Sequence, residues 1–478
     1  MNAPSPPPIA PAIELAQLFH AQQAAFARER YPDEAVRRDR LRRLLALVDD
    51  NEAALIAAID RDFGHRSVHE TRLAELYIVT SAIRHALANL ARWMKPQRVR
   101  TPLQLRPARG AIVRQPVGVV GIISPWNYPL QLAIAPAIGA IAAGNRVMLK
   151  PSELTPDVSA LLRDLVARCF RADEFAVVLG DASVGQAFAA LPWDHLFFTG
   201  STAVGRHVAR AAAENLTPVT LELGGKSPAL FAADADLAVA APRLAVGKLL
   251  NAGQTCIAPD YALVPRERRD AFVDAMRDAV AKLYPSLAAN PDYTSIVNER
   301  HYARLAGLVD DARAKGATIV ELNPGGDSLE ARTRKLAPTL IVDASDDMAV
   351  MREEIFGPLL PVETYATLDE AITKINARPR PLAFYYFGRD AGARDRVLKQ
   401  TIAGGVTVND TLWHFAHEEM PFGGIGASGI GAYHGEYSFR LFSKEKPVLV
   451  QPRFAATKLL YPPYGKTFEK VLGLLKRI

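Results

Sequence analysis

GVVGIIS, residues 118–124, is the first of five short apolar runs that decide the fold of this chain. The others are RVMLK (146–150), FAVVLG (175–180), HLFFTG (195–200) and PVTLEL (218–223). Each run is flanked by turn residues, as is typical of a buried strand. Segments with helical spacing separate most of the runs. This alternation of strands and helices predicts a parallel, doubly wound α/β sheet.

The carboxyl ends of the predicted strands carry polar or glycine-rich residues. Ligands bind at this edge of a parallel sheet. No GxGxxG motif follows any of the five runs, but GSTAVG (200–205) opens a helix whose free N–H groups suit a pyrophosphate. The same six residues also fit a tight strand-to-helix turn. The strand ends are Ser124 with Asn127, Lys150, Gly180, Thr199 with Gly200, and Glu222.

Two further regions surround this sheet. Residues 13–94 alternate charged and apolar side chains at helical spacing, which predicts long amphipathic helices with the charge run Arg37–Arg43 as their solvated face. A second α/β block runs from about residue 226 to residue 430. Its strands are expected at 261–265, 317–322, 336–342, 360–365 and 404–409.

Short extended segments precede and follow these blocks. Residues 99–116 predict a hairpin with ARG (108–110) as its turn, and SFRLFSKEKPVLVQPR predicts an edge strand near the end of the chain. The final helix carries Phe468, Val471, Leu472 and Leu475 on one face. We expect that face to pack on the body, with a membrane surface as the alternative.

Bulk composition narrows the class of protein. The chain has 478 residues, 49% of them hydrophobic, which suits two or three globular domains. A formal charge of +6 without a concentrated basic face argues against nucleic-acid binding. Two cysteines indicate a reducing compartment, and from the proline-rich start we expect no export signal. Polar residues and prolines interrupt the apolar stretch 117–143, so we expect a cytoplasmic protein without a spanning helix.

The two cysteines differ in their surroundings. Cys169 sits in an apolar helical pattern and is expected to be a packed, inert thiol. Cys256 follows NAGQT, whose small and polar residues suit a reactive thiol. Glu222, in LELGGKSP, is a candidate general base, although a strand-end carboxylate can also cap the following turn.

Seven ordered motifs along the chain resemble the aldehyde dehydrogenases, and NAGQTCIAPDY, GGVTVND and the YHG run are most similar to the class 3 branch. The motifs are SPWNYP, KPSE, FFTGSTAVG, LELGGKSP, GQTCIAPDY, EEIFGP and PFGGIGASGIGAYHG. The resemblance implies a Rossmann-type cofactor-binding domain (1–98 and 117–225) and an α/β catalytic domain (226–430). It further implies a small β oligomerisation element (99–116 and 431–455), a C-terminal tail helix (456–478), and a homodimer or higher homo-oligomer.

The resemblance also implies a chemistry. Cys256 would attack an aldehyde carbon, and the resulting thiohemiacetal would lose a hydride to become a thioester. The Asn127 amide and the Cys256 N–H would stabilise the oxyanion, and Glu222 would activate the hydrolytic water. From local sequence alone, Asn127 can also be a turn residue before Tyr-Pro.

Cofactor contacts are implied in the same way. Lys150 and Glu153 would hold the adenosine ribose, although KPSE also fits a helix start with a capping glutamate. Glu354 and Phe356 would orient the nicotinamide and its ribose. A carboxylate near the 2′ oxygen repels phosphate, so we expect NAD, with NADP as the alternative. The residues expected at the pyrophosphate are Gly200, Ser201 and Gly205.

The substrate is the least constrained part of this interpretation. Tyr128, Trp413 and His414, with Phe415, would line an entrance suited to aryl aldehydes such as coniferyl aldehyde, or would simply pack in the core. Medium- or long-chain aliphatic aldehydes are the alternative substrates. A thioesterase without redox chemistry, or a binding protein on the same fold, is the alternative function. We expect no metal.

Overall fold

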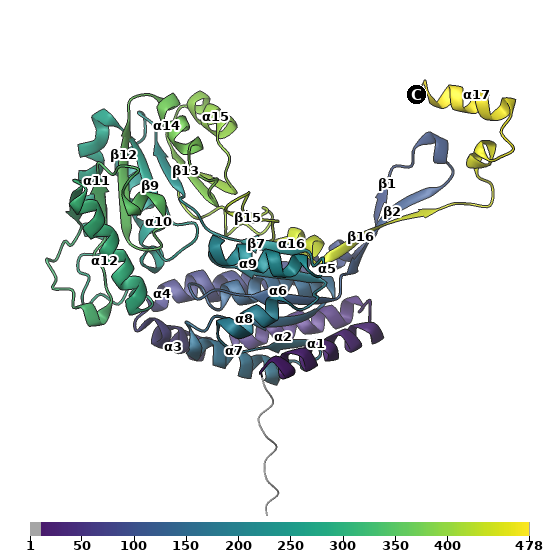
Figure 1. Ribbon diagram of the computed structural model, residues 1–478, viewed down its shortest axis with the longest axis horizontal. Coiled ribbons are helices and arrows are strands. Elements are labelled where there is room, and N and C mark those ends of the chain that lie inside the picture. The colour runs from purple at the N-terminus through teal and green to yellow at the C-terminus, as the bar shows by residue number, and fades with distance from the viewer. Residues whose placement is uncertain (1–10, 478) are drawn as a thin grey trace, which may run out of the picture.

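The computed structural model describes residues 11–477. The proline-rich leader, on which the expectation about an export signal depends, falls mainly in residues 1–10 and lies outside the described residues, as does Ile478. The described strands form three sheets, two in the body of the molecule and one in an arm that projects from it (Figure 1). The α/β fold expected from the alternation of strands and helices is confirmed.

The first sheet has six strands in the order β15-β7-β6-β3-β4-β5. All neighbours are parallel except β15, which runs antiparallel to β7. Each of the five apolar runs contains one parallel strand. The short β15 was not expected, and it returns the chain to this sheet after the second block. The bounds are β3 (Val119–Ile123), β4 (Arg146–Lys150), β5 (Phe175–Val177), β6 (His195–Thr199), β7 (Val219–Glu222) and β15 (Gly429–Ile430).

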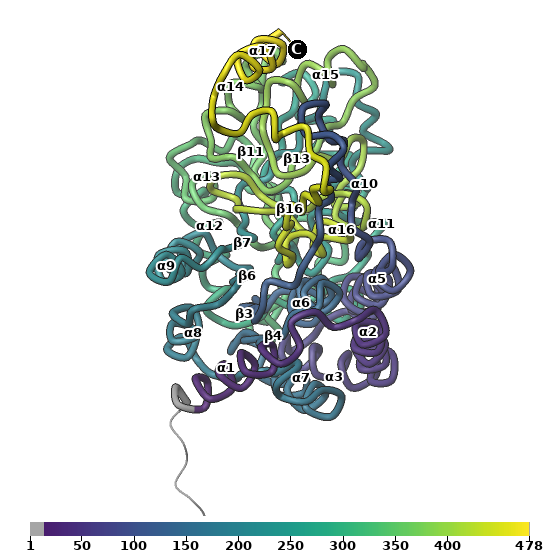
Figure 2. The backbone as a smooth tube through the Cα atoms, turned by 90° about the vertical axis from the view of Figure 1, so that its right-hand side faces the viewer, coloured from purple at the N-terminus to yellow at the C-terminus, as the bar shows by residue number. Residues whose placement is uncertain are grey.

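Helices cover both faces of this sheet, with α8 and α9 on one face and α2, α5 and α6 on the other (Figure 2). All of α6 except Ala135 is buried, so the apolar stretch 117–143 comprises a strand and a core helix. Within residues 11–477 no helix is long and apolar enough to cross a membrane. The bounds are α1 (Pro11–Arg28), α2 (Glu34–Asp49), α3 (Glu52–Phe63), α4 (Val68–Thr71), the π-helix η1 (Arg72–Tyr77), α5 (Ile78–Met94), α6 (Gln131–Ala143), α7 (Pro156–Cys169), α8 (Ala182–Ala189) and α9 (Thr202–Ala213).

The prediction that Arg37–Arg43 is a solvated face is wrong for two of its arginines. Arg37 is fully buried and donates to the carbonyls of Pro32 at 2.9 Å and Ala142 at 3.1 Å. Arg40 is 3% exposed. Helical spacing could not reveal this burial, because it comes from segments that pack on α2 from elsewhere in the chain.

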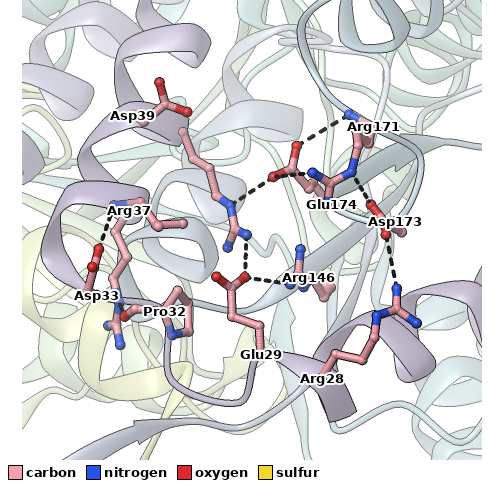
Figure 3. Close-up of polar contacts among 12 residues, drawn as sticks. Arg28, Glu29, Pro32, Asp33, Arg37, Asp39, Arg146, Arg171, Asp173 and Glu174 are labelled. Carbon is pink, nitrogen blue, oxygen red and sulfur yellow. Dashed lines mark hydrogen bonds and ion pairs between the residues drawn. The ribbon is translucent and has the colours of Figure 1, made fainter.

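Arg40 belongs to an ion-pair cluster that ties α2 to the first sheet. Figure 3 shows the cluster around Glu29, Arg146 and Glu174. The Arg40 guanidinium lies 2.8 Å from Glu29 and 3.3 Å from Glu174. Glu29 also pairs with Arg146 of β4 at 2.7 Å, and Glu174 pairs with Arg43 at 3.2 Å. Because each carboxylate bridges two arginines, the cluster fixes the N-terminal helices against the edge of the sheet that contains β4 and β5.

The second sheet has seven strands in the order β10-β11-β12-β9-β8-β13-β14, all parallel except β10. The strands β8 and β13 were not expected, although AFYYF, which lies between Pro381 and Gly388, fits a fully buried strand. The strands are β8 (Pro228–Phe231), β9 (Tyr261–Pro265), β10 (Thr318–Glu321), β11 (Thr339–Val342), β12 (Leu359–Tyr365), β13 (Ala383–Phe387) and β14 (Gly405–Val408). The helices are α10 (Leu237–Leu249), η3 (Leu250–Gly253), η4 (Arg266–Arg268), α11 (Arg269–Leu283), α12 (Glu299–Ala314), η5 (Ala331–Thr333), α13 (Ala349–Arg352), α14 (Leu368–Asn376) and α15 (Ala391–Gln400).

The third sheet is antiparallel and forms the root of the arm, with β2 (Arg109–Pro116) between β1 (Gln97–Val99) and β16 (Ser443–Val450). The prediction of a turn at ARG is wrong, because Arg109 and Gly110 are paired within β2. The connection runs instead through residues 100–108, where Pro102 and Pro107 interrupt the ladder and η2 (Leu103–Leu105) forms.

The C-terminal segment differs from expectation in two ways. Residues 435–441 form a helix, α16 (Gly435–Leu441), that packs on α5 and α6 of the body rather than joining the arm. The helix α17 (Lys466–Leu475) follows η6 (Ala456–Leu460), lies at the far end of the arm and has no buried residue (Figure 1). The prediction that it packs on the body is therefore wrong for the single chain. The domain boundaries stay a prediction.

Candidate active site

Polar residues gather at the carboxyl edge of the first sheet. In the registers of the parallel strands, Lys150 ends β4 beside Ile123 of β3, and Glu222 ends β7 beside Thr199 of β6. Asn127 follows β3 by four residues. The strand order therefore brings together side chains that are almost a hundred residues apart in sequence.

A kinked loop brings the thiol to this edge. After α10, residues Asn251 and Ala252 adopt left-handed backbone angles, with φ of 54° and 51°. Gly253 also has a positive φ, and a Cβ there would lie 2.3 Å from the Gly357 carbonyl oxygen. Strained backbone of this kind persists only where the surroundings hold it, and it clusters at functional sites. The kink ends the helix and turns the chain toward Cys256.

Cys256 is half-buried and forms part of the wall of an apolar pocket. Burial raises the pKa of its thiol to about 12, and the negative charges of Glu354 and Glu222 add to the shift. A thiolate is the nucleophilic form. The thiol of the free protein therefore stays protonated near neutral pH, and a nearby base is needed to activate it.

Glu222 supplies such a group. Its side chain is 2% exposed, and within the described part of the chain neither carboxylate oxygen has a hydrogen-bond partner. The alternative that Glu222 caps the following turn is therefore excluded. Burial raises the pKa of Glu222 well above its usual value. A buried carboxyl without partners costs stability, so its presence beside a thiol favours a chemical role.

Asn127 is joined to the cysteine loop from both sides. Its side-chain Nδ2 donates to the Gln254 carbonyl at 3.1 Å, and its own carbonyl accepts from the Asn251 side chain at 3.0 Å. It is 3% exposed. These long-range contacts go beyond what a local turn requires. They hold an amide donor close to the backbone that leads to Cys256.

The apolar pocket runs from this loop to the surface. Tyr128 belongs to its wall and is bound through its hydroxyl to Thr255 Oγ1 at 2.7 Å. Trp413 and Tyr77 also belong to the wall and are 58% and 60% exposed, so they mark its mouth. Sequence analysis missed Tyr77, because its segment carried only the signal of an amphipathic helix. Further lining residues are Leu73, Ala74, Ile78, Val246, Leu250, Ile257, Leu412 and Phe415.

The structure does not place His414 in this pocket, so that prediction is wrong. Its Nδ1 lies 2.8 Å from Thr407 Oγ1 on β14, and its ring packs against Gly405. Burial lowers its pKa to about 4, so the ring is neutral. Leu412 has a positive φ of 64°, which turns the chain so that Trp413 and Phe415 reach the pocket while His414 faces the strand.

The predicted ribose contacts form a close pair. Lys150 is buried, and its Nζ donates to Glu153 at 2.8 Å. Burial opposes ionisation, but this hydrogen bond lowers the pKa of Glu153 below its usual value. The helix α7 begins only at Pro156, with Thr155 as its N-cap residue. The alternative that KPSE starts a helix is therefore wrong.

The glycine pair GSTAVG lies between β6 and α9. Ser201 is the N-cap of α9 and accepts from the Val204 N–H at 3.3 Å. A Cβ at Gly205 would lie 2.7 Å from Leu223, and one at Gly200 would lie 2.6 Å from the Phe198 ring. Close packing thus accounts for both glycines, and it leaves the N-terminus of α9 at the carboxyl edge of the sheet.

Glu354 and Phe356 reach the same edge from the second block. A Cβ at Gly224 would lie 2.2 Å from the Glu354 carboxylate, so this glycine admits the side chain just after β7. Burial, and then the charge of Asp260, raise the pKa of Glu354 to about 8. Phe356 has a positive φ of 53°, and its ring meets Trp126 edge-on at 5.4 Å. The two blocks thus meet around Cys256 and Glu222.

The chain matches the aldehyde dehydrogenase family over residues 9–448 and belongs to that family. It is 53% identical over 459 residues to a Pseudomonas aeruginosa protein named "Probable coniferyl aldehyde dehydrogenase", with 96% of this chain and 95% of that protein covered. A solved structure of Staphylococcus aureus AldH in a substrate-bound state has a TM-score of 0.92 and 40% identity, covering 96% and 99%. The Mycobacterium tuberculosis aldehyde dehydrogenase complexed with NAD⁺ has a TM-score of 0.83 and 29% identity, covering 94% and 92%.

Proposed function

We propose that this protein oxidises aldehydes to carboxylic acids with NAD, or alternatively NADP, as the hydride acceptor. One observation carries the proposal. A half-buried thiol, Cys256, belongs to an apolar pocket, and the charge of an unpartnered buried carboxyl, Glu222, acts on it. The amide of Asn127 is fixed against the loop that leads to this thiol. A nucleophile, a base and an oxyanion donor are the three groups that a covalent acyl mechanism requires.

The chain's own residues define the steps. Glu222 takes the proton of the Cys256 thiol and passes it to solvent, and the sulfur bonds to the aldehyde carbon, so that negative charge develops on the former carbonyl oxygen. Asn127 Nδ2 and the Cys256 N–H stabilise this oxygen. The carbon then loses a hydride and becomes a thioester. Glu222 takes a proton from water, which attacks the thioester, releases the carboxylic acid and restores the thiol.

The residues at the sheet edge fit a dinucleotide. The buried ammonium of Lys150 and the carboxylate of Glu153 form a donor and acceptor pair that suits two ribose hydroxyls. When bound, NAD supplies the acceptor for the hydride at its nicotinamide ring. The Glu153 charge disfavours a 2′ phosphate, which supports NAD over NADP. Gly200, Ser201 and Gly205 would border the pyrophosphate, and Glu354 and Phe356 the nicotinamide side.

For the substrate we propose aryl aldehydes such as coniferyl aldehyde, with medium- or long-chain aliphatic aldehydes as the alternative. The name of the Pseudomonas aeruginosa relative supports the first class. The pocket adds support, because three aromatic side chains, Tyr128, Trp413 and Phe415, belong to its apolar lining. A hydrocarbon chain would also fit such a lining, so a comparison of substrates decides between the two classes.

We propose a homodimer or higher homo-oligomer assembled through the arm. Leu449 and Val450 on β16 are 53% and 62% exposed, and Phe454 and Tyr461 beyond it are 79% and 60% exposed. Large apolar side chains concentrated on a projecting element mark an interaction surface. Light scattering of the purified protein tests this, and a monomer at micromolar concentration contradicts it.

The central test is the pair of variants Cys256→Ala and Cys169→Ala. With NAD and coniferyl aldehyde, we expect NADH absorbance to rise in the wild-type protein and in Cys169→Ala, but not in Cys256→Ala. NADH formation also excludes a thioesterase as the sole activity. Turnover of Cys256→Ala at the wild-type rate would reject the covalent mechanism. A panel of aryl, aliphatic and semialdehyde substrates with each cofactor then defines the specificity.

A further inference from the structure

Arg66 and Glu75 form an ion pair at 3.0 Å, and both side chains are 0% exposed. Burying two charges costs free energy that their mutual attraction often fails to recover. Such a pair contributes little to the net stability of the fold, so stability alone does not explain why it lies at this position. It lies beside the segment that carries Asn127, and none of the steps above uses it.

The pair holds the Asn127 segment at two points. The same Arg66 Nη1 that meets Glu75 also donates to the Asn127 carbonyl at 2.9 Å. The other oxygen of Glu75 accepts from the N–H groups of Leu130 at 2.9 Å and Gln131 at 2.8 Å. Between these points, the guanidinium lies 4.8 Å from the centre of the Tyr128 ring. Residues 127–131 are therefore fixed by one charged unit.

A second carboxylate from the same helical segment holds the cysteine loop. Glu70 is 9% exposed and accepts from the N–H of Asn251 at 3.1 Å and from Thr294 Oγ1 at 2.6 Å. Asn251, with its left-handed backbone, in turn donates through its side chain to the Asn127 carbonyl and to the Gln254 carbonyl at 3.1 Å. The Asn127 carbonyl thus accepts from Arg66 on one side and Asn251 on the other.

We propose that Arg66 and Glu75 are positioning residues, which set the Asn127 amide relative to Cys256. The π-helix η1 makes this possible, since its wider turn directs Glu75 inward while Leu73 and Tyr77 of the same turn border the substrate pocket. The inference rests on the proposed function, because it concerns the donor to the oxyanion. It adds two residues that never touch the reacting atoms.

The variant Glu75→Gln keeps the shape of the side chain but removes the charge that Arg66 faces. A displacement of about 1 Å at a reacting group can slow a reaction about a hundredfold. We therefore expect single-turnover NADH formation to slow about a hundredfold, with little change in the KM for NAD. Alkylation of Cys256 by iodoacetamide proceeds without an oxyanion, so its rate should stay within about threefold of wild type.

Two further variants make the result specific. Arg66→Lys keeps a charge for Glu75 but loses the planar fork, and it should show the same selective loss. Arg37→Lys is the matched control, because Arg37 is also fully buried and binds two backbone carbonyls, but at the opposite end of α6. We expect that control to lower the melting temperature without slowing NADH formation.

The possible outcomes separate the two proposals. The inference is overturned if Glu75→Gln and Arg66→Lys transfer hydride at the wild-type rate, or if NADH formation and alkylation slow equally. Failure of both variants to fold also overturns it, in favour of a purely structural pair. If the wild-type protein itself forms no NADH from any aldehyde, the proposed function fails instead.

Discussion

Replacing Asn127 by alanine tests the proposed oxyanion donor, because the structure separates its chemical effect from its structural one. The side chain donates one hydrogen bond, from Nδ2 to the Gln254 carbonyl at 3.1 Å. That carbonyl keeps a second donor, Asn251 Nδ2, also at 3.1 Å. No buried carbonyl is left without a partner, so the free energy of unfolding should fall by only about 1 kcal/mol.

The expected chemical effect is much larger. Removal of one oxyanion donor lowers kcat by about 10² to 10³, which corresponds to about 2.7–4 kcal/mol in the activation barrier. Stopped-flow measurement of NADH formation in a single turnover gives the barrier, and urea denaturation gives the stability. The two values should differ by at least about 1.5 kcal/mol, well beyond the error of either measurement.

Asn145→Ala is the matched control for this experiment. Asn145 is 1% exposed, and its side chain accepts from the Gly118 N–H and donates to the carbonyls of Ala140 and Phe442. It lies just before β4, at the amino edge of the sheet, whereas the site lies at the carboxyl edge. Asn145→Ala should lower stability more than Asn127→Ala and leave single-turnover kinetics of the folded protein unchanged. The reasoning is refuted if folded Asn127→Ala forms NADH within about threefold of the wild-type rate.

Four further predictions concern three carboxyl groups. Because burial raises the pKa of Glu222, its basic form gains population as pH rises, so thioester hydrolysis should accelerate from neutral to alkaline pH. Glu222→Gln should give a burst of NADH and then slow turnover; steady wild-type turnover contradicts the assignment. Glu354→Gln should accelerate alkylation of Cys256 above pH 8 but not well below it, because burial raises the pKa of the wild-type carboxyl to about 8. The control Glu353→Gln, which changes the exposed neighbouring residue, should have no effect. Equal acceleration by both variants contradicts the argument. Glu174→Gln should lower the free energy of unfolding by about 2 kcal/mol. This loss is smaller than that for breaking an isolated buried ion pair, because Arg40 keeps Glu29 and Arg43 keeps Asp39 as partners. Its arginine partners hold the pKa of Glu174 below its usual value despite burial, so this stabilisation is present above the unfolded pKa and disappears as pH falls through the folded one; a pH-independent difference contradicts it.

The sheet edge was the part of the site that the sequence could predict. Strand ends follow from local hydrophobic patterns, and the carboxyl ends of parallel strands share an edge whatever their order. Lys150, Thr199 and Glu222 were therefore placed at one edge from their runs alone. Cys256 follows no strand of that sheet. Its position depends on the left-handed turn at Asn251 and Ala252, and no hydrophobic periodicity in the sequence predicts that turn.

Side-chain direction and long-range pairing account for what sequence analysis missed. His414 lies between two pocket residues but faces a strand, because the φ of Leu412 rotates the backbone just before it. Arg37 lies in α2 and Arg66 in the loop between α3 and α4, and both stretches are rich in charge, where solvated side chains are the usual expectation. Arg37 binds the carbonyl of Ala142, 105 residues away, and Arg66 binds that of Asn127, 61 residues away, and such long-range pairing leaves no pattern in the local sequence.

The pKa shifts in the site have burial as their common cause, and burial limits which groups can carry charge before the reaction. Burial is the main reason why the pKa values of Cys256, Glu222 and Glu354 are raised, and the two carboxylates raise the pKa of the thiol further. Ionisation of either carboxyl therefore disfavours ionisation of the thiol. Near neutral pH the site carries few charges before ligands bind. When the sulfur attacks the aldehyde, the largest new negative charge therefore develops on the substrate oxygen, beside the fixed hydrogen-bond donors. It does not reside on the thiol before the attack. Because the Asn127 amide is one of those donors, the segment that fixes Asn127 contributes to the proposed reaction although it never touches the reacting atoms.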